Sequence, residues 1–346
     1  MFVRNLVSVQ TISDIKPIED ADAIELVVVK GWQCVAKKGE FKVGDSCIYF
    51  EVDCFLPIDN RFEFLRKSSY RNNEYMGEGF RVKTITLRGE VSQGLALPLD
   101  NFPEASSASV GEDITELLSV KKWELPEQLS NAGTAIGNKP FGIPTTDETR
   151  IQSIPEFLEH FIGKPYYIST KMDGTSCTIY CRNGKVGVCG RNDEYKEDVK
   201  SCSMWQLVYK RGLKEKLLAL GENIAIQGEF CGPGIQKNRL KLMEPTLFVF
   251  DIIKIADNDK LTKCGLSDLS YYCTELGLDM VPVEESADSF NYTMAELLEK
   301  AKGKYPSGMD KEGIVVRTQD YGRAGENMHK LSFKVINNDF LKKEKD

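Results

Sequence analysis

Short apolar stretches that alternate with polar residues fill the first third of the chain. Between residues 23 and about 120, turn residues separate the runs AIELVVV, WQCVA, KVGDSCIYFEV, FRVKTITLRG and GLALPL. Alternation with a period of two residues is typical of half-buried strands, and turn residues between such runs mark the corners of a sheet. The pattern predicts a compact all-β module, either a small barrel or a sandwich.

A stretch without periodicity, rich in Pro, Gly, Ser and Thr, separates this module from a second region and predicts a linker over 126–148. After it, SIPEFLEHFIG predicts a helix with Ser153 as its N-cap. Strands are then expected in YYIST, TSCTIYCR, KVGVCGR, ENIAIQGEF and TLFVFDIIK, and helices at about 199–220, in LSDLSYYCTEL and in TMAELLEKAKG. We therefore expect an α+β protein, with a β-module over 1–125 and a domain of antiparallel sheets flanked by helices over 149–346.

Composition narrows the protein class. The 346 residues are 41% hydrophobic and carry a net charge of −7, which suits a globular protein and argues against coating nucleic acid through bulk charge. No apolar run of about 18 residues is present, so we expect neither a secreted nor a membrane protein but an intracellular one, cytoplasmic or nuclear. Ten cysteines without a C-x-x-C pair predict buried free thiols, and only two histidines favour a hard cation on oxygen ligands for any metal site.

One lysine stands at the end of a predicted strand, in Lys171-Met172-Asp173-Gly174. At average residue usage, K-x-D-G occurs by chance in about one chain of this length in twenty, so alone it is weak. Four further segments give it weight. GEFCG places Glu229 at a strand end, FVFDI puts Phe248, Phe250 and Ile252 on one face, KEGIVVR begins a strand with Glu312, and KLSFKV puts Lys330, Ser332 and Lys334 on one face.

In this order and spacing, the segments resemble the motifs of the covalent nucleotidyltransferase superfamily, which comprises ATP-dependent RNA and DNA ligases and mRNA capping enzymes. The resemblance spans about residues 145–340. It assigns Lys171 to Gly174 to motif I, Glu229 to motif III, residues 248–251 to motif IIIa, residues 312–315 to motif IV, and Lys334, with Lys330 as the weaker assignment, to motif V. The motif V lysines of the family are commonly separated by one residue, and this chain departs from that pattern.

The resemblance implies that the Lys171 amine attacks the α-phosphorus of ATP, expels pyrophosphate and forms lysyl-AMP. An amine of pKa about 10.4 is neutral in only about one part in 2,500 at pH 7, which costs about 4.6 kcal/mol. Carboxylates alone would raise this cost, because nearby negative charge favours the ammonium form. Mg²⁺ or Mn²⁺ held by Asp173, Glu229 and Glu312, directly or through waters, would reverse the sign.

The same resemblance gives roles to the remaining candidate residues. Glu229 would contact the ribose hydroxyls, and Phe250 would lie against the adenine, with core packing as its alternative. Lys334, with Lys330 assisting, would contact the α-phosphate. Two arginines complete the nucleotide-binding set with Asp173 and Gly174. Arg191 in GRND follows a strand where related ligases keep an arginine near the nucleotide or the RNA end, and Arg150 would reach a phosphate or form a salt bridge at a helix start.

Domain order separates the members of the superfamily. DNA ligases and capping enzymes carry an OB domain after motif V, but only about a dozen residues follow Lys334. The β-module instead comes first, and its sequence from Asp22 to Pro57 resembles that of the N-terminal OB domain of the Deinococcus- and Naegleria-type RNA ligases.

The expected activity is ATP-dependent sealing of RNA 3′-OH and 5′-phosphate ends, with a nicked duplex as substrate and a monomeric enzyme. An mRNA-capping-type guanylyltransferase and a non-catalytic nucleic-acid-binding protein with a degenerate transferase domain are the alternatives.

Overall fold

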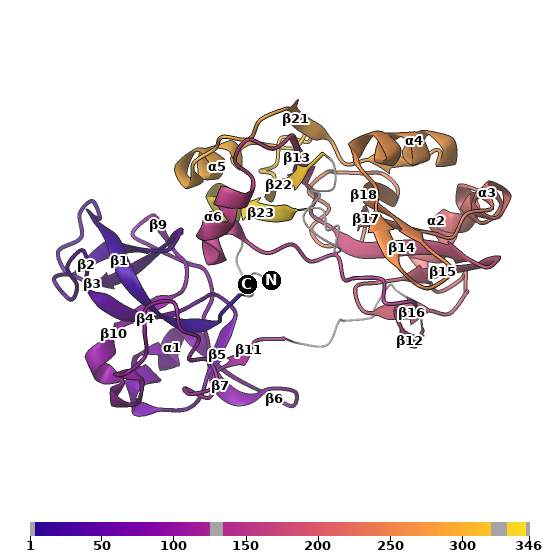
Figure 1. Ribbon diagram of the computed structural model, residues 1–346. Helices are drawn as coiled ribbons and strands as arrows, with labels where there is room; N and C mark the ends of the chain where they lie inside the picture. Colours follow the sequence, from indigo (N-terminus) through magenta and orange to yellow (C-terminus); the bar gives the residue numbers. More distant parts are fainter. Residues whose placement is uncertain (1–3, 125–133, 320–330, 344–346) are drawn as a thin grey trace. The chain divides into compact units, whose positions relative to one another are not determined.

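The chain forms two compact units (Figure 1). The computed structural model describes residues 4–124, 134–319 and 331–343. The N-terminal unit comprises Met1–Glu127, Thr149–Leu158 and Leu341–Asp346, and the C-terminal unit comprises Gln128–Glu148 and Glu159–Phe340. The short segment Thr149–Leu158 thus clusters with the N-terminal unit, although in sequence it lies just before β13 (Tyr166–Lys171), the strand of the C-terminal unit that carries Lys171.

Antiparallel sheets build the N-terminal unit. One has the strand order β10-β4-β1-β2-β3 and another the order β11-β5-β7-β6, while β8 pairs with β9. The strands are β1 (Val7–Pro17), β2 (Ile24–Val29), β3 (Trp32–Lys37), β4 (Ser46–Phe50), β5 (Cys54–Leu56), β6 (Tyr70–Asn73), β7 (Gly77–Arg81), β8 (Ile85–Leu87), β9 (Glu90–Ser92), β10 (Leu95–Pro98) and β11 (Lys121–Lys122), with the one-turn helix α1 (Arg66–Ser69). Strand β1, which pairs with both β2 and β4, was not among the predicted strands.

Strand β4 is apolar on both of its faces. Ile48 and Phe50 face one hydrophobic cluster, whereas Cys47 and Tyr49 face another, which also contains Trp32. Both faces of the strand are therefore covered, as in a curled sheet that encloses its own core. Because each face of β4 packs on a hydrophobic cluster, the strand is an unbroken apolar run, CIYF.

Two antiparallel sheets carry the C-terminal unit. The larger has the order β12-β16-β15-β14-β17-β18-β19, with β20 added in parallel to β18, and the smaller has the order β21-β13-β22-β23. Their strands are β12 (Ala135–Asn138), β13 (Tyr166–Lys171), β14 (Thr175–Arg182), β15 (Lys185–Cys189), β16 (Asp193–Tyr195), β17 (Ile224–Cys231), β18 (Thr246–Ile255), β19 (Leu261–Lys263), β20 (Asp279–Met280), β21 (Val283–Ala287), β22 (Gly313–Thr318) and β23 (Ser332–Ile336).

Helices cover one face of the larger sheet (Figure 1). They are α2 (Ser203–Lys210), α3 (Leu213–Leu220) and α4 (Leu266–Leu276), and their apolar residues pack on Ile179, Ile226 and Val249. The single helix predicted at about 199–220 is two helices, because Gly212 adopts a left-handed conformation between them (φ 60°). Helix α5 (Met294–Lys300) begins with a capping box of Thr293 and Glu296, and α6 (Asn338–Lys343) ends the described chain.

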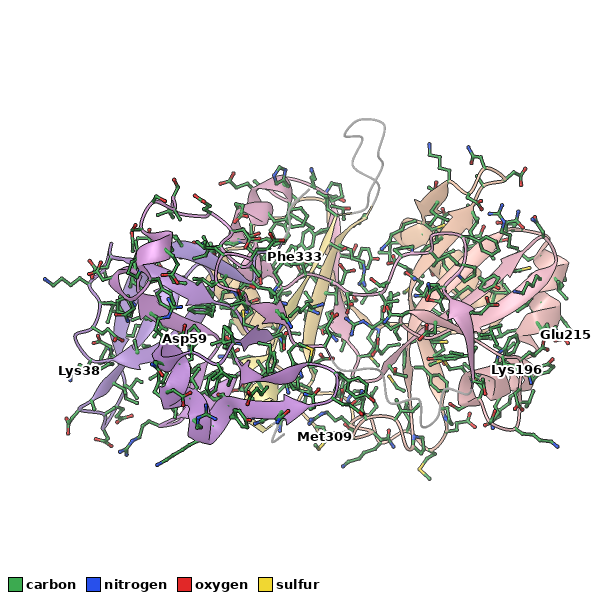
Figure 2. The ribbon with its side chains drawn as sticks, turned by 90° about the horizontal axis from the view of Figure 1, so that it is seen from below. Lys38, Asp59, Lys196, Glu215, Met309 and Phe333 are labelled. Atoms are coloured by element: carbon green, nitrogen blue, oxygen red, sulfur yellow. The ribbon has the colours of Figure 1, made fainter. Side chains whose placement is uncertain are left out.

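Aromatic rings form the core of the smaller sheet. Phe333 on β23 (Figure 2) has its ring centroid 4.8 Å from that of Phe161 and 6.3 Å from that of Phe290. The rings meet edge to face, which is the preferred arrangement for aromatic pairs. This core holds β22 and β23 in place beside β13.

The helix predicted in SIPEFLEHFIG does not form as an α-helix. The segment consists of 3₁₀ turns at Ile151–Ser153 and Pro155–His160, and the prediction of Ser153 as N-cap is wrong. The Ser153 hydroxyl donates instead to the buried carboxylate of Glu51, 2.7 Å away. A buried carboxylate needs donors, and this demand outweighs local capping.

The predictions about the cysteines and about membrane-spanning segments can be compared with the described residues. All ten cysteines are free and buried, as predicted. Within the described ranges, no helix is long and apolar enough to cross a membrane.

Candidate active site

Lys171 ends β13, and the neighbouring strand brings a carboxylate to it. In the register of β13 with β22, Lys171 lies opposite Gly313, the residue after Glu312. The Lys171 Nζ donates to Glu312 Oε2 at 2.6 Å, and both side chains keep about a fifth of their surface exposed. The structure thus brings the lysine of the KMDG segment and the glutamate of the KEG segment into direct contact.

Tyr305 fixes this corner of the site. Its hydroxyl donates to the carbonyl oxygen of Lys171 at 2.7 Å and accepts from the backbone N–H of Glu312 at 3.1 Å. The ring is buried, so the hydroxyl links motif I to motif IV rigidly. Sequence analysis missed Tyr305, because a tyrosine among turn residues gives no periodic signal.

Glu229 comes from β17, where it lies opposite Ser176 on β14. The backbone N–H of Gly174 acts to lower the pKa of the Glu229 carboxyl, against the larger effect of burial. A Cβ atom at position 174 would lie 2.5 Å from the Phe230 carbonyl oxygen and 2.6 Å from the Cys231 Sγ. Glycine is therefore required at this point of motif I, because any side chain would push motif I away from motif III.

Asp173 is bound by an arginine that sequence analysis did not single out. Its Oδ2 accepts from the Nε of Arg239 at 2.9 Å, and the buried Arg239 guanidinium lies 4.4 Å from the ring centroid of Phe340. Burial raises the pKa of Asp173, and the charge of Glu312 adds to the rise, against the opposing charge of Arg239. Asp173 therefore bonds Arg239 and acts on the Lys171 amine through its charge.

The charges around Lys171 do not balance. Burial lowers the pKa of the Lys171 amine, but the carboxylates of Glu312, Glu229 and Asp173 together outweigh it, so the pKa is raised. Burial raises the pKa of Glu229 to about 7, opposed by the Lys171 charge and reinforced by Glu312 and Asp173. The carboxylates alone therefore hold the amine in its unreactive charged form, as predicted.

The donor set suits a hydrated divalent cation. Among the described residues, no three His, Cys, Asp or Glu side chains converge closely enough to hold a bare metal ion. Two of the three carboxylates instead point at cationic side chains, Glu312 at Lys171 and Asp173 at Arg239. Burial, reinforced by neighbouring negative charge, raises the pKa of Asp173 and of Glu229. Such carboxylates fit a cation bound through its own waters, which magnesium retains readily.

Phe250 lies on the same side of the larger sheet as motif I. It packs with Met172, Cys231, Val281 and Tyr305, and Phe248 lies against the same cluster. The prediction that Ile252 shares this face is wrong, since Ile252 packs on the helical side. The register shift opposite Gln227 and Gly228 makes Phe250 an extra, bulged residue and inverts the alternation after it.

A buried arginine supports the Phe250 ring. The Arg317 guanidinium lies 5.4 Å from the ring centroid, and it donates to Ser169 Oγ at 3.0 Å and to Glu148 Oε1 at 3.5 Å. Glu148 also accepts from the Ser332 hydroxyl on β23 at 2.6 Å. This chain of contacts ties the bulge of β18 to the smaller sheet and was not visible in the sequence.

The remaining predicted site residues lie on other segments of the chain. Lys334 is half-buried on β23, opposite Val315 of β22. Arg191 pairs with Asp147 at an exposed position of the C-terminal unit. Arg150 belongs to the N-terminal unit, where its guanidinium lies 5.6 Å from the ring centroid of Trp32. Lys330 lies outside the described residues.

Comparisons with known proteins agree with this geometry. A family model described as RNA ligase matches residues 164–336, and a model described as an OB-fold domain matches residues 6–99. Naegleria gruberi RNA ligase with PPi is 36% identical, with a TM-score of 0.84 and coverage of 99% of both chains. No curated protein matches.

Two further structures of mutants of the same Naegleria gruberi enzyme are similar. One, with ATP and Mn, has a TM-score of 0.85 at 36% identity and covers 98% of this chain and 99% of that chain. The other, with AMP and Mn, has the same identity and TM-score and covers 99% of each chain. The chain therefore belongs to the RNA ligase family. The predicted fold class and enzyme class are confirmed, and neither a capping enzyme nor a non-catalytic binder is favoured.

Proposed function

We propose that the protein is an ATP-dependent ligase that joins the 3′-OH and 5′-phosphate ends of RNA through lysyl-AMP at Lys171. The observation that carries the proposal is the Lys171 amine, bonded to Glu312 at 2.6 Å and surrounded by two further carboxylates. A strained charge balance around a partly exposed nucleophile is typical of a functional site. The similar Naegleria structures with ATP and Mn, AMP and Mn, and PPi support the nucleotide and the leaving group.

In the first step, the Lys171 lone pair attacks the α-phosphorus of ATP, a P–N bond forms, and the P–O bond to pyrophosphate breaks. Glu312 aims the amine through its hydrogen bond, and Tyr305 holds the two backbones at the required separation. A divalent cation, Mg²⁺ or Mn²⁺, bound through waters by Asp173, Glu229 and Glu312 would lower the pKa of the amine and offset charge on the phosphate.

The surrounding residues position the nucleotide. Phe250, supported by Arg317, offers a ring face for the adenine. We assign Glu229 to the ribose hydroxyls and Lys334, with Lys330, to the α-phosphate, where positive charge stabilises the five-coordinate transition state. Arg191 and Arg150 are assigned to phosphates of the nucleotide or of the RNA end.

The two later steps use the same centre. An oxygen of the RNA 5′-phosphate attacks the phosphorus of lysyl-AMP, which frees the Lys171 amine and leaves AMP on the RNA end. The 3′-OH then attacks the 5′-phosphorus and AMP departs. We propose a nick in an RNA-containing duplex as the substrate, a monomeric enzyme and an intracellular site of action, and we expect the OB-fold unit to be needed for sealing.

Intact-mass measurement of the purified protein after incubation with ATP and Mg²⁺ tests the proposal. We expect a gain equal to one AMP on Lys171, and none in Lys171→Met protein. Equal labelling of the Lys171→Met protein would overturn the mechanism. A parallel incubation with GTP separates a ligase from a capping enzyme, since only the latter would acquire GMP.

Nick sealing gives the second test. Duplexes with RNA or DNA on each side of a nick, and single strands with the same ends, should rank with the RNA-containing nick first. Faster joining of the single strands would contradict the proposed substrate.

A further inference from the structure

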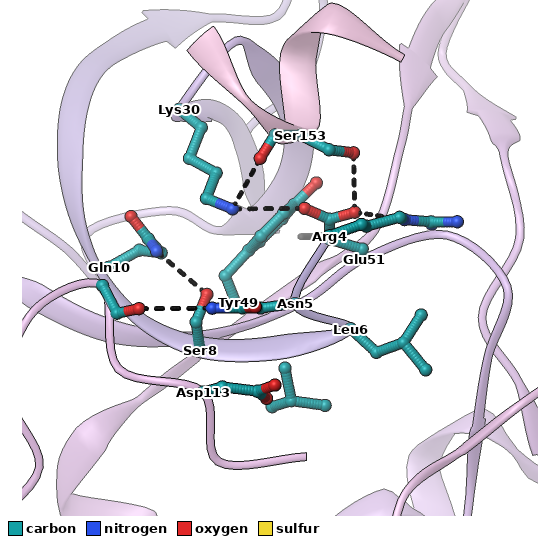
Figure 3. A network of polar contacts seen from close by, with 12 residues as sticks. Arg4, Asn5, Leu6, Ser8, Gln10, Lys30, Tyr49, Glu51, Asp113 and Ser153 are labelled. Carbon is teal, nitrogen blue, oxygen red and sulfur yellow. Dashed lines mark hydrogen bonds and ion pairs between the residues drawn. The ribbon is translucent and has the colours of Figure 1, made fainter. Parts of the chain in front are cut away.

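A second buried ion cluster lies in the N-terminal unit, around Glu51 (Figure 3). The Glu51 side chain has no exposed surface. Its carboxylate accepts from Arg4 Nε at 2.7 Å, from Lys30 Nζ at 3.3 Å and from the Ser153 hydroxyl at 2.7 Å. A fully buried carboxylate needs such partners, because an unpaired one is strongly destabilising.

One of these partners, Lys30, and the residue after it also bind a segment more than a hundred residues away in the chain. Besides bonding Glu51, Lys30 donates to the Ser153 carbonyl oxygen at 3.0 Å, and the N–H of Gly31 donates to the Gln152 carbonyl oxygen at 3.5 Å. Lys30 and Gly31 form the turn between β2 and β3. This turn and Glu51 together grip residues 150–154, a set of contacts that we call the Glu51 clasp.

The gripped segment is as buried as a core strand. Ile151, Gln152, Ser153 and Ile154 keep at most 4% of their surface exposed. Arg150, at the start of the segment, has its guanidinium 5.6 Å from the ring of Trp32, the first residue of β3. The ring against which Arg150 lies therefore belongs to the same unit as the clasp.

We propose that Glu51 is a positioning residue that acts through Arg150. By holding Ser153 and Lys30, the Glu51 clasp fixes residues 150–154 to the OB-fold unit and so sets where Arg150 presents its charge. This inference rests on the proposed function, since it takes Arg150 as a phosphate contact of the ligase reaction.

A paired variant tests the clasp without leaving either Glu51 or Lys30 as an unpaired buried charge, and Arg4, whose side chain is a quarter exposed, keeps Asp53 at 3.8 Å. Lys30→Met/Glu51→Met removes both charges at similar side-chain volume, a replacement that buried ion pairs often tolerate. Ser153→Ala removes only the hydroxyl donor and serves if the double variant does not fold. Asp53→Asn is the matched control: Asp53 lies 3.8 Å from Arg4, does not bond Ser153, and has φ 71°, which asparagine tolerates.

The first readout is hydrogen exchange in the full-length protein, followed by mass spectrometry. We expect the amides of residues 149–158 to exchange about tenfold or more faster in the double variant, as loss of hydrogen bonds to a charged group implies. Ser153→Ala should give a smaller increase in the same peptide. Unchanged protection in both variants, or an equal loss in Asp53→Asn protein, would overturn the clasp.

The second readout is the reaction itself, with AMP labelling and nick sealing measured separately against ATP and RNA concentration. Arg150→Ala and the double variant should slow the same step, each by about tenfold or more, as expected for one phosphate contact. The combined variant should be no worse than Arg150→Ala, since both changes act through one side chain. Multiplying losses, defects in different steps, or an Arg150→Ala protein of parental activity would each contradict the positioning role.

The two failures remain distinguishable. If the parent protein neither acquires AMP on Lys171 nor seals RNA, the proposed function fails, while hydrogen exchange still reports whether the clasp exists. If the parent is active and exchange increases without any kinetic loss, the clasp is structural only and the positioning role is wrong.

Discussion

The Lys171 site and the Glu51 clasp are both partly or fully buried clusters of charges, but their balances are opposite. Glu51 is one carboxylate that receives hydrogen bonds from Arg4, Lys30 and the Ser153 hydroxyl. Lys171 is one amine that faces three carboxylates, and one of these, Asp173, pairs with an arginine. The clasp is satisfied by the chain itself, whereas the catalytic cluster carries an excess of negative charge.

This difference separates a structural ion cluster from a reactive one. A cluster whose charged groups are all paired within the chain stabilises one conformation and needs no ligand to neutralise it. In the unbalanced cluster burial, reinforced by Glu312 and Asp173, raises the pKa of Glu229 to about 7, and the three carboxylates raise the pKa of Lys171. The site therefore carries excess negative charge that a cation can offset. The excess of negative charge around Lys171 therefore indicates a nucleophile that becomes reactive only when a cation is bound.

Removal of divalent cations should have the largest effect. With excess EDTA, AMP labelling of Lys171 should fall by about a thousandfold or more, because the carboxylates then hold the amine charged and nothing offsets the phosphate charge. The measurement is the rate of mass gain with ATP, before and after Mg²⁺ or Mn²⁺ is restored. Labelling that persists without a divalent cation would show that the excess negative charge around Lys171 does not serve to bind a catalytic cation.

Glu312→Gln should rank next. The substituted amide would keep an oxygen near the Lys171 amine but lose the charge that aims and polarises it, and we expect AMP labelling to slow by about a hundredfold. Glu285→Gln is the control, since that carboxylate also binds a lysine and two tyrosines but belongs to β21 away from motif I. Comparable losses in both variants would mean that folding, and not the catalytic cluster, had been affected.

Glu229→Gln should stabilise the apo protein while impairing labelling. A carboxyl with its pKa raised to about 7 in the folded state binds a proton more tightly than in the unfolded state. Folding stability is therefore lost as pH rises from about 4.5 through 7, by about 2 kcal/mol for a coupled, partly open group. Urea unfolding at pH 5 and pH 8 measures this difference, and the variant should show less of it. An unchanged pH dependence would argue against a raised pKa of Glu229.

The smallest effect is expected for Tyr305→Phe. The change removes the hydroxyl that links Lys171 to Glu312, and labelling should slow by about fivefold with a loss of about 1 kcal/mol in unfolding free energy. Tyr209→Phe, which removes an exposed hydroxyl that bonds Glu197, is the control. A Tyr305→Phe protein indistinguishable from the parent would leave the corner of the site fixed by its strands alone.

Lys171, Glu229 and Glu312 could be singled out from the sequence because they belong to recognisable motifs. In the structure Lys171 ends β13 and Glu312 directly precedes β22, whereas Glu229, expected at a strand end, lies inside β17. The neighbours of these residues could not be singled out. Tyr305 and Arg239 come from loops, where no period marks a side chain that turns toward the site. The orientation of Ile252 failed for a local reason, since a single bulged residue in β18 inverts the pattern that alternation predicts.

The fold was likewise predictable in its main strands but not in every segment. Alternating runs located most strands of the OB-fold, but β1 escaped because SVQTISDIKP mixes polar residues on its exposed end. The segment after the predicted linker was misjudged at Ser153, where local text indicated a helix cap. Its hydroxyl bonds Glu51, about a hundred residues earlier, and a contact at that separation leaves no trace in the spacing of residues.

The most direct test of the central claim is the titration of the Lys171 amine itself, by NMR of protein labelled at lysine Cε, with Lys171→Met for assignment. In the free protein, we predict a pKa above the ordinary lysine value, because the three carboxylates outweigh burial. With a non-hydrolysable ATP analogue bound, addition of Mg²⁺ should lower that pKa. A pKa already below the ordinary value in the free protein, or one that Mg²⁺ leaves unchanged, would contradict the account.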